Sequence, residues 1–276
     1  MKRLPMLAAT ALVIGLANGN ARADELVQVA PHRATPPAQR GETTPPLLGF
    51  LTRPYGPGRF PAVVLLHWCS GFGAHDTTAA ATLKSWGFVA LALDSLGDAN
   101  MCQGGGGSMA EVVDAYAALR FLAARDFVAS DRIAVMGYSM GGLATLAAVD
   151  RSPLAEGQPA RFRAAIAYYP PCQFITGDLT APALILIGEH DDWSSPDACR
   201  KLLTHENDIG ITRGPGTGAT IDLIVYPDAT HAFDSDLPPH RYLGHFMRYD
   251  PAATQDAATK VHAFLRDKIG DLPEMP

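Results

Sequence analysis

The sequence predicts an α/β fold in which helices cover both faces of a mostly parallel central sheet. Apolar segments of strand length alternate along the chain with segments of helical character, and this order is typical of such a sheet. Several apolar segments, such as 183–187, have no polar interruption, as expected for strands buried on both faces. With 276 residues, 47% of them hydrophobic, the chain can build one domain with a large core, which we expect over 47–276.

The strands and helices are expected in regular alternation. Strands are expected at 48–52, 61–66, 88–93, 133–136, 164–169, 183–187 and 221–226. Helices are expected near 78–86, 109–124, 143–149, 196–206 and 252–267. Because helices separate most of the strands, successive strands are expected to run parallel, with the helices packed on the sheet.

The first 23 residues have the pattern of an export signal rather than of a folded element. Two basic residues precede an apolar segment at 4–17, and Ala21-Arg22-Ala23 provides a small-x-small cleavage site. The apolar segment is too short to cross a bilayer, so we expect a periplasmic or secreted protein without stable membrane insertion. Residues 24–46, rich in proline and threonine, are expected to form an extended lead-in to the domain.

Charge and motif spacing exclude several other classes of function. The net charge is −6 and the pI about 5.8, and no basic stripe is present that would bind nucleic acid. The glycine run at 104–107 lacks the Gly-Lys-Ser/Thr ending of a phosphate-binding loop. No ligand spacing such as His-Glu-x-x-His indicates a metal, so we expect no metal site.

Ser139 is the strongest candidate for a catalytic residue. It is the central residue of Gly-Tyr-Ser-Met-Gly at 137–141, between the expected strand 133–136 and the expected helix 143–149. A sharp strand-to-helix turn presents its serine as a nucleophile, and flanking glycines suit a turn that is strained and crowded by its neighbours. The alternative is an ordinary turn with a solvated serine, against which the partners described next argue.

An acid and a histidine follow Ser139 in the order in which such a serine needs them. Asp191 and Asp192 come directly after the expected strand 183–187, and we favour Asp191 as the acid while keeping Asp192 as its competitor. His231 lies on the loop after the expected strand 221–226 and is the candidate base. The chain therefore predicts a serine, histidine and aspartate triad.

The same chemistry requires backbone N–H groups that stabilise the negative charge on the substrate oxygen. One donor is expected from Met140, directly after the serine. The other is expected on the loop after strand 61–66, where we assign the N–H of Cys69. His67 in that loop is interpreted as a structural residue that holds the loop, not as a second base.

These segments together resemble the dienelactone hydrolase family of the α/β-hydrolase fold. The resemblance rests on Gly-Tyr-Ser-Met-Gly-Gly at 137–142, Gly-Glu-His-Asp-Asp-Trp at 188–193 and Ala-Thr-His-Ala-Phe at 229–233, and extends from about 47 to 265. It implies hydrolysis of esters or lactones through a covalent acyl-enzyme, without a metal or organic cofactor.

Two positions depart from the family pattern. The founding members use a cysteine as nucleophile, whereas Ser139 places this chain with a serine-bearing branch. Related oxyanion loops often carry glycine directly after the histidine, and Trp68 occupies that place here. Trp68 would be strained if the position required a positive φ; otherwise it helps to form the wall of the acyl pocket.

The four cysteines are expected to form two disulfides in an oxidising compartment, although free thiols are the alternative. Cys69 and Cys102 follow neighbouring expected strands, while Cys172 and Cys199 flank the expected strand 183–187. We therefore predict the pairs Cys69 with Cys102 and Cys172 with Cys199. Each bridge would restrain a loop at the active-site edge of the sheet.

The predicted function is hydrolysis of a small-molecule ester or lactone by an exported monomer or weak homodimer. Several aromatic side chains are candidates for the substrate pocket: Trp68, Tyr138 and Trp193, with Tyr168 and Tyr169. Two alternatives remain open, a polyester hydrolase or peptidase with the same triad, and a catalytically silent binding protein.

Overall fold

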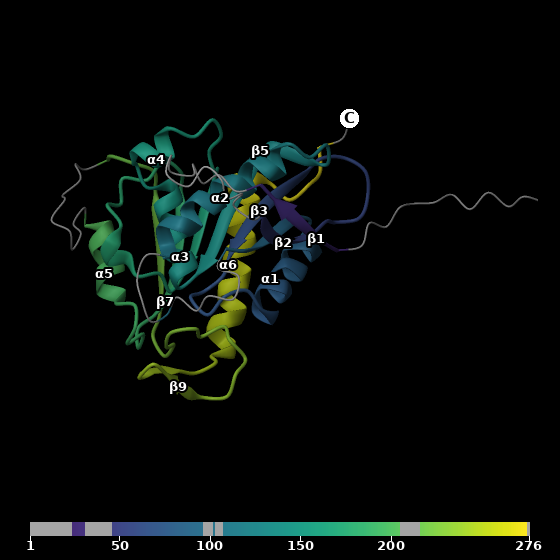
Figure 1. Cartoon of the computed structure of the whole chain (residues 1–276). Helices are drawn as coiled ribbons and strands as arrows, with labels where there is room; N and C mark the ends of the chain where they lie inside the picture. The colour runs from purple at the N-terminus through teal and green to yellow at the C-terminus, as the bar shows by residue number, and fades with distance from the viewer. Residues whose placement is uncertain (1–23, 31–45, 96–101, 103–106, 205–215, 275–276) are drawn as a thin grey trace, which may run out of the picture.

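The computed structural model describes residues 24–30, 46–95, 102, 107–204 and 216–274 (Figure 1). The predicted export signal at 1–23 and most of the predicted lead-in lie outside the described residues. The glycine run at 104–107 also lies outside them, apart from its last residue.

Eight strands form one sheet in the order β1-β2-β4-β3-β5-β6-β7-β8. Strand β2 is antiparallel to β1 and to β4, and every other neighbouring pair is parallel. The strands span Glu25–Val29 (β1), Leu47–Thr52 (β2), Phe60–Leu66 (β3), Val89–Asp94 (β4), Val128–Tyr138 (β5), Ala165–Tyr168 (β6), Ala183–Gly188 (β7) and Ile221–Tyr226 (β8). The predicted mostly parallel sheet is confirmed.

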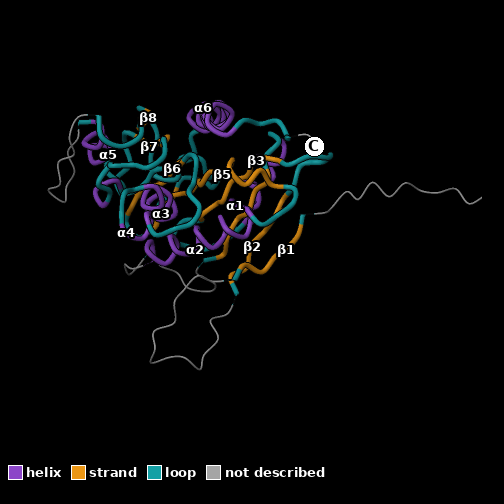
Figure 2. Tube along the Cα trace, turned by 90° about the horizontal axis from the view of Figure 1, so that it is seen from above, coloured by secondary structure: helices purple, strands orange, loops and turns teal. Residues whose placement is uncertain are grey.

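Helices cover both faces of this sheet, as predicted. They span Ala74–Ser85 (α1), Gly107–Ala123 (α2), Met140–Val149 (α3), Pro153–Glu156 (α4), Pro196–Leu203 (α5) and Pro251–Ile269 (α6). Figure 2 shows α6 on one side of the strands and α2 and α3 on the other. Trp86 at the end of α1 stacks on His262 of α6 at 4.7 Å, which places α1 on the face that α6 covers.

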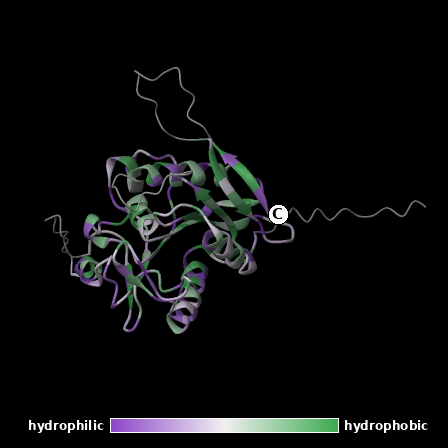
Figure 3. Ribbon diagram, turned by 60° about the horizontal axis from the view of Figure 1, so that its bottom comes forward, coloured by the Kyte–Doolittle hydropathy of each residue, from purple (hydrophilic) through white to green (hydrophobic). Residues whose placement is uncertain are grey.

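The central strands form the core of the molecule. Every residue of β3 and of β7 is buried, as expected of strands that have helices on both faces. Figure 3 shows these central strands coloured mainly as hydrophobic. Because β3, β5, β7 and β8 run parallel, their carboxyl ends lie at one edge of the sheet. The loops after these strands are the ones that carry the predicted site residues.

Four parts of the fold differ from the sequence-based expectation, one of which is the four-residue helix α4, which was not expected. Strand β1 lies within the predicted lead-in 24–46 and pairs with β2, where Val29 is almost fully buried. A hairpin of β9 (His240–Tyr242) and β10 (His245–Met247) follows β8, and neither strand was expected. These strands are only three to five residues long, too short for hydrophobic periodicity to reveal them. A 3₁₀ helix, η2 (Cys172–Phe174), was also not anticipated.

Candidate active site

Ser139 lies on a strained turn between β5, which ends at Tyr138, and α3, which begins at Met140. Its backbone angles, φ of 51° and ψ of −111°, are a combination that a non-glycine residue rarely adopts. A side chain at Gly137 would collide with the carbonyl of Gly141, and one at Gly141 with the carbonyls of Leu66 and His67. The two glycines therefore allow the turn to lie against the end of β3.

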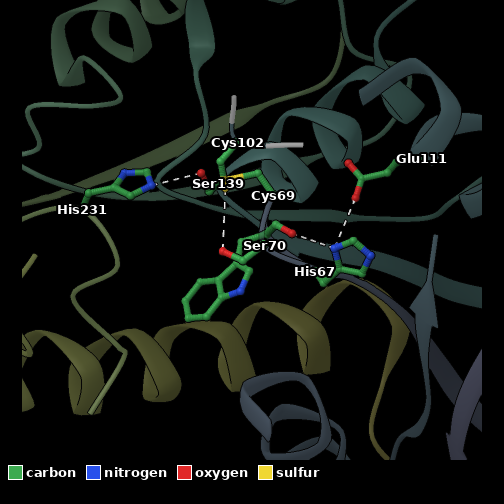
Figure 4. The surroundings of a disulfide bond; sticks show 8 residues. His67, Cys69, Ser70, Cys102, Glu111, Ser139 and His231 are labelled. Carbon is green, nitrogen blue, oxygen red and sulfur yellow. Dashed lines mark hydrogen bonds and ion pairs between the residues drawn. A yellow bond between two sulfur atoms is a disulfide. The ribbon is translucent and has the colours of Figure 1, made fainter. Parts of the chain in front are cut away.

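His231 connects Ser139 with Asp191. Its Nε2 lies 3.0 Å from Ser139 Oγ, a contact visible in Figure 4, and its Nδ1 lies 2.8 Å from Asp191 Oδ2. All three residues are buried, with 9%, 2% and 7% of their surface exposed for serine, histidine and aspartate. Their polar atoms therefore interact where solvent screens them little.

The neighbouring carboxylates of Asp191 and Asp192 have different partners. Asp191 Oδ1 accepts the N–H groups of Trp193 at 2.9 Å and Ser194 at 2.7 Å, which orients Oδ2 toward His231. The half-exposed Asp192 carboxylate instead accepts the N–H of Phe246, with Oδ2 at 3.2 Å. Of the two carboxylates, Asp191 is thus the one in contact with His231.

The loop after β3 brings Cys69 to the cavity that also contains Ser139 and His231. Cys69 is bonded to Cys102, and Cys172 is bonded to Cys199, so both predicted disulfides are confirmed. Figure 4 shows the first bridge beside Ser139. Cys69 and Ser70 line the same cavity as Ser139.

His67 holds this loop from within the core, as the sequence indicated. The Ser95 N–H donates to His67 Nε2 at 3.2 Å, so the ring proton is on Nδ1, which donates to the carbonyl of Trp68 at 2.7 Å. Glu111 lies behind the ring, with Oε1 3.7 Å from Nδ1 (Figure 4). His67 thereby ties the loop after β3 to the end of β4.

Glu111 is an unusual neighbour for this loop, because its side chain is fully buried. Neither of its carboxyl oxygens forms a hydrogen bond within the described part of the chain. Burial above all, with the charges of Asp114 and Asp76, raises the pKa of the Glu111 carboxyl well above its usual value. The carboxyl is therefore neutral over a wider pH range than an exposed one.

A cavity of about 210 Å³ opens over Ser139 and His231. Its apolar wall comes from three separate segments of the chain and includes Trp68, Trp193, Ala232, Leu237, Tyr242 and Met247. Trp68 and Trp193, which the sequence analysis named as candidates for the substrate pocket, both line this cavity. Among the described non-glycine residues, a positive φ occurs at Ser139, Tyr169, Ala232 and Leu243. Trp68 is not one of these residues, so its position in the loop does not require the backbone strain considered in the sequence analysis.

The prediction that Tyr138 lines the substrate pocket is corrected by the structure. Tyr138 lines a separate cavity of about 160 Å³, to which α1 and α6 also contribute. Its ring lies edge-on to His75 at 4.4 Å and tilted against Tyr168 at 5.0 Å. Tyr138 is the last residue of β5, whereas the chain turns sharply at Ser139 with a φ of 51°, so proximity in sequence did not place Tyr138 in the cavity of Ser139.

Comparison with known proteins agrees with this geometry. The family model for the dienelactone hydrolase family matches residues 47–269. The chain belongs to the dienelactone hydrolase family. It is accordingly a carboxylic-ester hydrolase with the α/β-hydrolase fold.

Relatives of this dienelactone hydrolase family member include a Bradyrhizobium protein named "Probable 2-oxo-3-(5-oxofuran-2-ylidene)propanoate lactonase". The two are 25% identical over 79% of this chain and 88% of the relative. Among solved structures, a dienelactone hydrolase-like promiscuous phosphotriesterase from metagenomic libraries is 20% identical, with a TM-score of 0.66 over 90% of this chain and 100% of that one. A thermophilic esterase from Thermogutta terrifontis, with propionate bound, is 19% identical, with a TM-score of 0.63 over 92% and 97%.

The hairpin β9–β10 contributes cavity residues of this family member that the sequence analysis missed. His240, Tyr242 and Met247 come from the hairpin, and Leu237 precedes it. The hairpin is attached to the acid loop through Asp192, and Trp193 stacks on His245 at 4.5 Å. The spacing of histidine and aromatic residues at 240–247 was visible in the sequence, but nothing local indicated that the segment folds over Ser139.

Asp234 forms a second polar connection across the site. Its Oδ1 accepts the Tyr169 hydroxyl at 2.7 Å, and its Oδ2 lies 3.0 Å from His75 Nε2. The Tyr169 ring lies edge-on to His231 at 4.7 Å, and His75 stacks on Trp68 at 4.8 Å. Asp234 thereby connects the loop of the histidine with the segment that follows the loop of Cys69.

The pKa of His75 reflects this connection. Burial disfavours the imidazolium, but the charge and hydrogen bond of Asp234, together with the charges of Asp76 and Asp236, outweigh it. The pKa of His75 is therefore raised above its usual 6.5. Protonated His75 and the Asp234 carboxylate form an ion pair beneath Trp68.

Two other features are absent among the described residues, a metal site and a membrane-spanning helix. They contain no group of three His, Cys, Asp or Glu side chains that would hold a metal ion. No helix among them is long and apolar enough to span a membrane.

Proposed function

We propose that the protein is an exported serine hydrolase that cleaves carboxylic esters or lactones through an acyl-enzyme. Ser139 is the nucleophile, His231 the general base and Asp191 the acid that orients the histidine. The observation that carries the proposal is the pair of contacts at His231, to Ser139 Oγ at 3.0 Å and to Asp191 Oδ2 at 2.8 Å.

Acylation begins when Ser139 Oγ attacks the carbonyl carbon and transfers its proton to His231 Nε2. The carbonyl π electrons move onto oxygen, and Asp191 stabilises the imidazolium through the Nδ1–H. The ester C–O bond then breaks, and the leaving alkoxide takes the proton from Nε2. Water activated by His231 subsequently attacks the acyl-enzyme, which releases the acid and regenerates Ser139.

The negative charge on the substrate oxygen is assigned to the N–H groups of Met140 and Cys69. Met140 is the first residue of α3, and N–H groups in a first helical turn lack intrahelical acceptors. Cys69 lines the same cavity from the opposite loop. Losing one such donor typically costs about 2.7–4 kcal/mol in the transition state.

Two observations support the remaining parts of the proposal. Two disulfides agree with an exported protein whose segment 1–23 is removed near Ala23. Because β1 joins the sheet, the proposed single domain includes Glu25–Val29 as well as residues from 47 onward. The cavity of about 210 Å³ suits a small-molecule substrate held against Trp68 and Trp193. The cavity is lined by residues of one chain, and we propose a monomer or weak homodimer.

Labelling with a fluorophosphonate probe tests the nucleophile. The mature oxidised protein is expected to gain one adduct on Ser139, measured by intact mass and peptide mapping. Ser139→Ala should abolish the adduct, and His231→Ala should reduce its rate by several orders of magnitude. A folded, oxidised protein that takes up no probe would contradict the proposal and favour the silent binding protein instead.

The two adjacent carboxylates provide a matched pair for the acid. Asp191→Asn is expected to lower kcat by about 10⁴-fold, because the amide no longer selects the correct tautomer of His231. Asp192→Asn makes the same chemical change one residue away and should lower kcat by less than about tenfold. Equal losses in the two variants would refute the assignment.

The relatives favour esters and lactones over amides as substrates. The Bradyrhizobium protein is named as a lactonase and the Thermogutta protein as an esterase. A panel of chromogenic esters, lactones, polyester films and peptide amides is expected to show turnover of the first two classes.

A further inference from the structure

The cavity over Ser139 has a distinct chemical character. Apart from Ser139 and His231, the polar side-chain groups among its lining residues are all uncharged hydroxyls and ring nitrogens: those of Ser70, Ser235, Tyr242, His240 and the indoles of Trp68 and Trp193. The Nδ1 of His240 donates to the carbonyl of Pro238 at 2.8 Å. The rest of its wall is apolar or aromatic. Among the described residues that line it, none is lysine or arginine.

Cationic groups on the surrounding segments are engaged with other partners. Arg241 donates to the carbonyl of Gly244, and Arg248 donates to the carbonyl of Asp228. His245 is paired with Asp192, and the raised pKa of His75 belongs to its pairing with Asp234. The sequence from 96 to 106, which contains the disulfide partner Cys102, has no lysine or arginine.

The wall formed by the hairpin is fixed at several points. Asp192 accepts the Phe246 N–H, and Thr230 Oγ1 accepts the Arg248 N–H at 2.9 Å. Met247 also forms a backbone bridge with His231. Because these contacts hold the hairpin against the histidine loop, the described wall of the cavity is fixed in an arrangement that brings no lysine or arginine to a bound substrate.

We propose that this site selects uncharged esters with an apolar or aromatic group and discriminates against substrates that carry a carboxylate on that group. The proposal rests on the proposed ester hydrolase function. Transfer of a carboxylate from water into an apolar site without a counter-ion is costly. An uncharged ring of the same size gains from burial against Trp68, Trp193 and Leu237.

Two pairs of substrates that differ in charge but hardly in size test this selection. For the acyl side, the 4-nitrophenyl ester of terephthalic acid is compared with that of its monoamide. For the alcohol side, 4-acetoxybenzoate is compared with 4-acetoxybenzamide. In the pair whose ring enters the cavity, kcat/KM for the neutral member is expected to be about 100-fold higher, after correction for intrinsic reactivity.

A preference of 30-fold or more for the neutral member in either pair supports the proposal, and a smaller preference in both pairs overturns it. If Ser139 takes up the fluorophosphonate and both charged esters are hydrolysed as fast as the neutral ones, this inference alone has failed. If Ser139 takes up no probe and no ester is hydrolysed, the proposed function has failed and this inference with it.

A variant that supplies the missing charge tests the physical cause. Leu237 lines the cavity and is 52% exposed, so Leu237→Arg is tolerated without burying a cation. It should raise kcat/KM for the carboxylate member at least tenfold, and added salt should weaken the gain. Leu237→Gln and the distant Leu272→Arg, at an exposed site, should leave the charge preference unchanged. An equal gain in either control would overturn the explanation by charge.

Discussion

The two disulfides occupy different regions of the molecule although they close loops of similar length. Cys69 of the first bridge lines the cavity beside Ser139, whereas Cys172 and Cys199 of the second are fully buried between η2 and α5. With sequence separations of 33 and 27, loop entropy alone assigns them about 3.8 and 3.6 kcal/mol. Loop length therefore does not distinguish them, and their surroundings must decide what each contributes.

Removing the buried bridge should have the largest effect, on stability. Cys172→Ala with Cys199→Ala is expected to lower the free energy of unfolding by about 3–4 kcal/mol, measured by urea denaturation. The folded fraction should keep kcat within about twofold, because the bridge does not contact the cavity. A large loss of kcat in the folded variant would show that both bridges shape the site.

Removing the bridge at the cavity should act on the rate. Cys69→Ala with Cys102→Ala is expected to lower kcat about 100-fold, equivalent to about 2.7 kcal/mol, because the proposed oxyanion donor loses its tether. KM for a small neutral ester should change little, since the apolar wall remains. Unchanged kcat in the folded variant would place the donor elsewhere and remove the contrast between the bridges.

Asp234 connects two segments beside the cavity through hydrogen bonds, and its removal can be compared with removal of the disulfide at the cavity. Asp234→Asn is expected to lower kcat about tenfold, since Tyr169 and His75 contact different oxygens of the carboxylate and asparagine replaces one of these acceptors by an NH2 donor. Asp236→Asn, the same change at an exposed neighbouring position, is the matched control and should have little effect.

NMR titration of the same variant follows the charge of His75. Its pKa should fall when the Asp234 charge is removed. In the wild type, the ion pair stabilises the fold fully below pH 6.5, and this contribution disappears as pH rises through the elevated pKa. An unaltered titration of His75 would refute the pairing.

The smallest effect is expected at Glu111, behind the loop of Cys69. Its pKa is raised on folding, so its favourable contribution is complete below the usual pKa and decreases as pH rises through the folded value. Glu111→Gln should therefore be more stable than the wild type at pH 8, by about 2–4 °C in Tm, and nearly equal at pH 4. A gain that did not depend on pH would exclude titration of Glu111 as its cause.

Much of the architecture was predictable from local sequence. Apolar segments such as 183–187, bounded by turn residues, indicated the buried strands, and the alternation with helices indicated parallel connections. The glycines around Ser139 and the chain order of Asp191 and His231 indicated the site. Strand β1 and the hairpin β9–β10 were missed, because strands this short acquire their structure from their partners.

The sequence by itself determined which residue types follow which strand, and hence that Ser139, Asp191, His231 and the cysteine pairs meet at one edge of the sheet. Only the tertiary structure decided between Asp191 and Asp192, directed Tyr138 away from the cavity and brought Tyr242 and Met247 over Ser139. The physical reason is that strand order follows from patterns along the chain. The direction of a single side chain and the contacts of an irregular loop depend on backbone angles that distant partners impose.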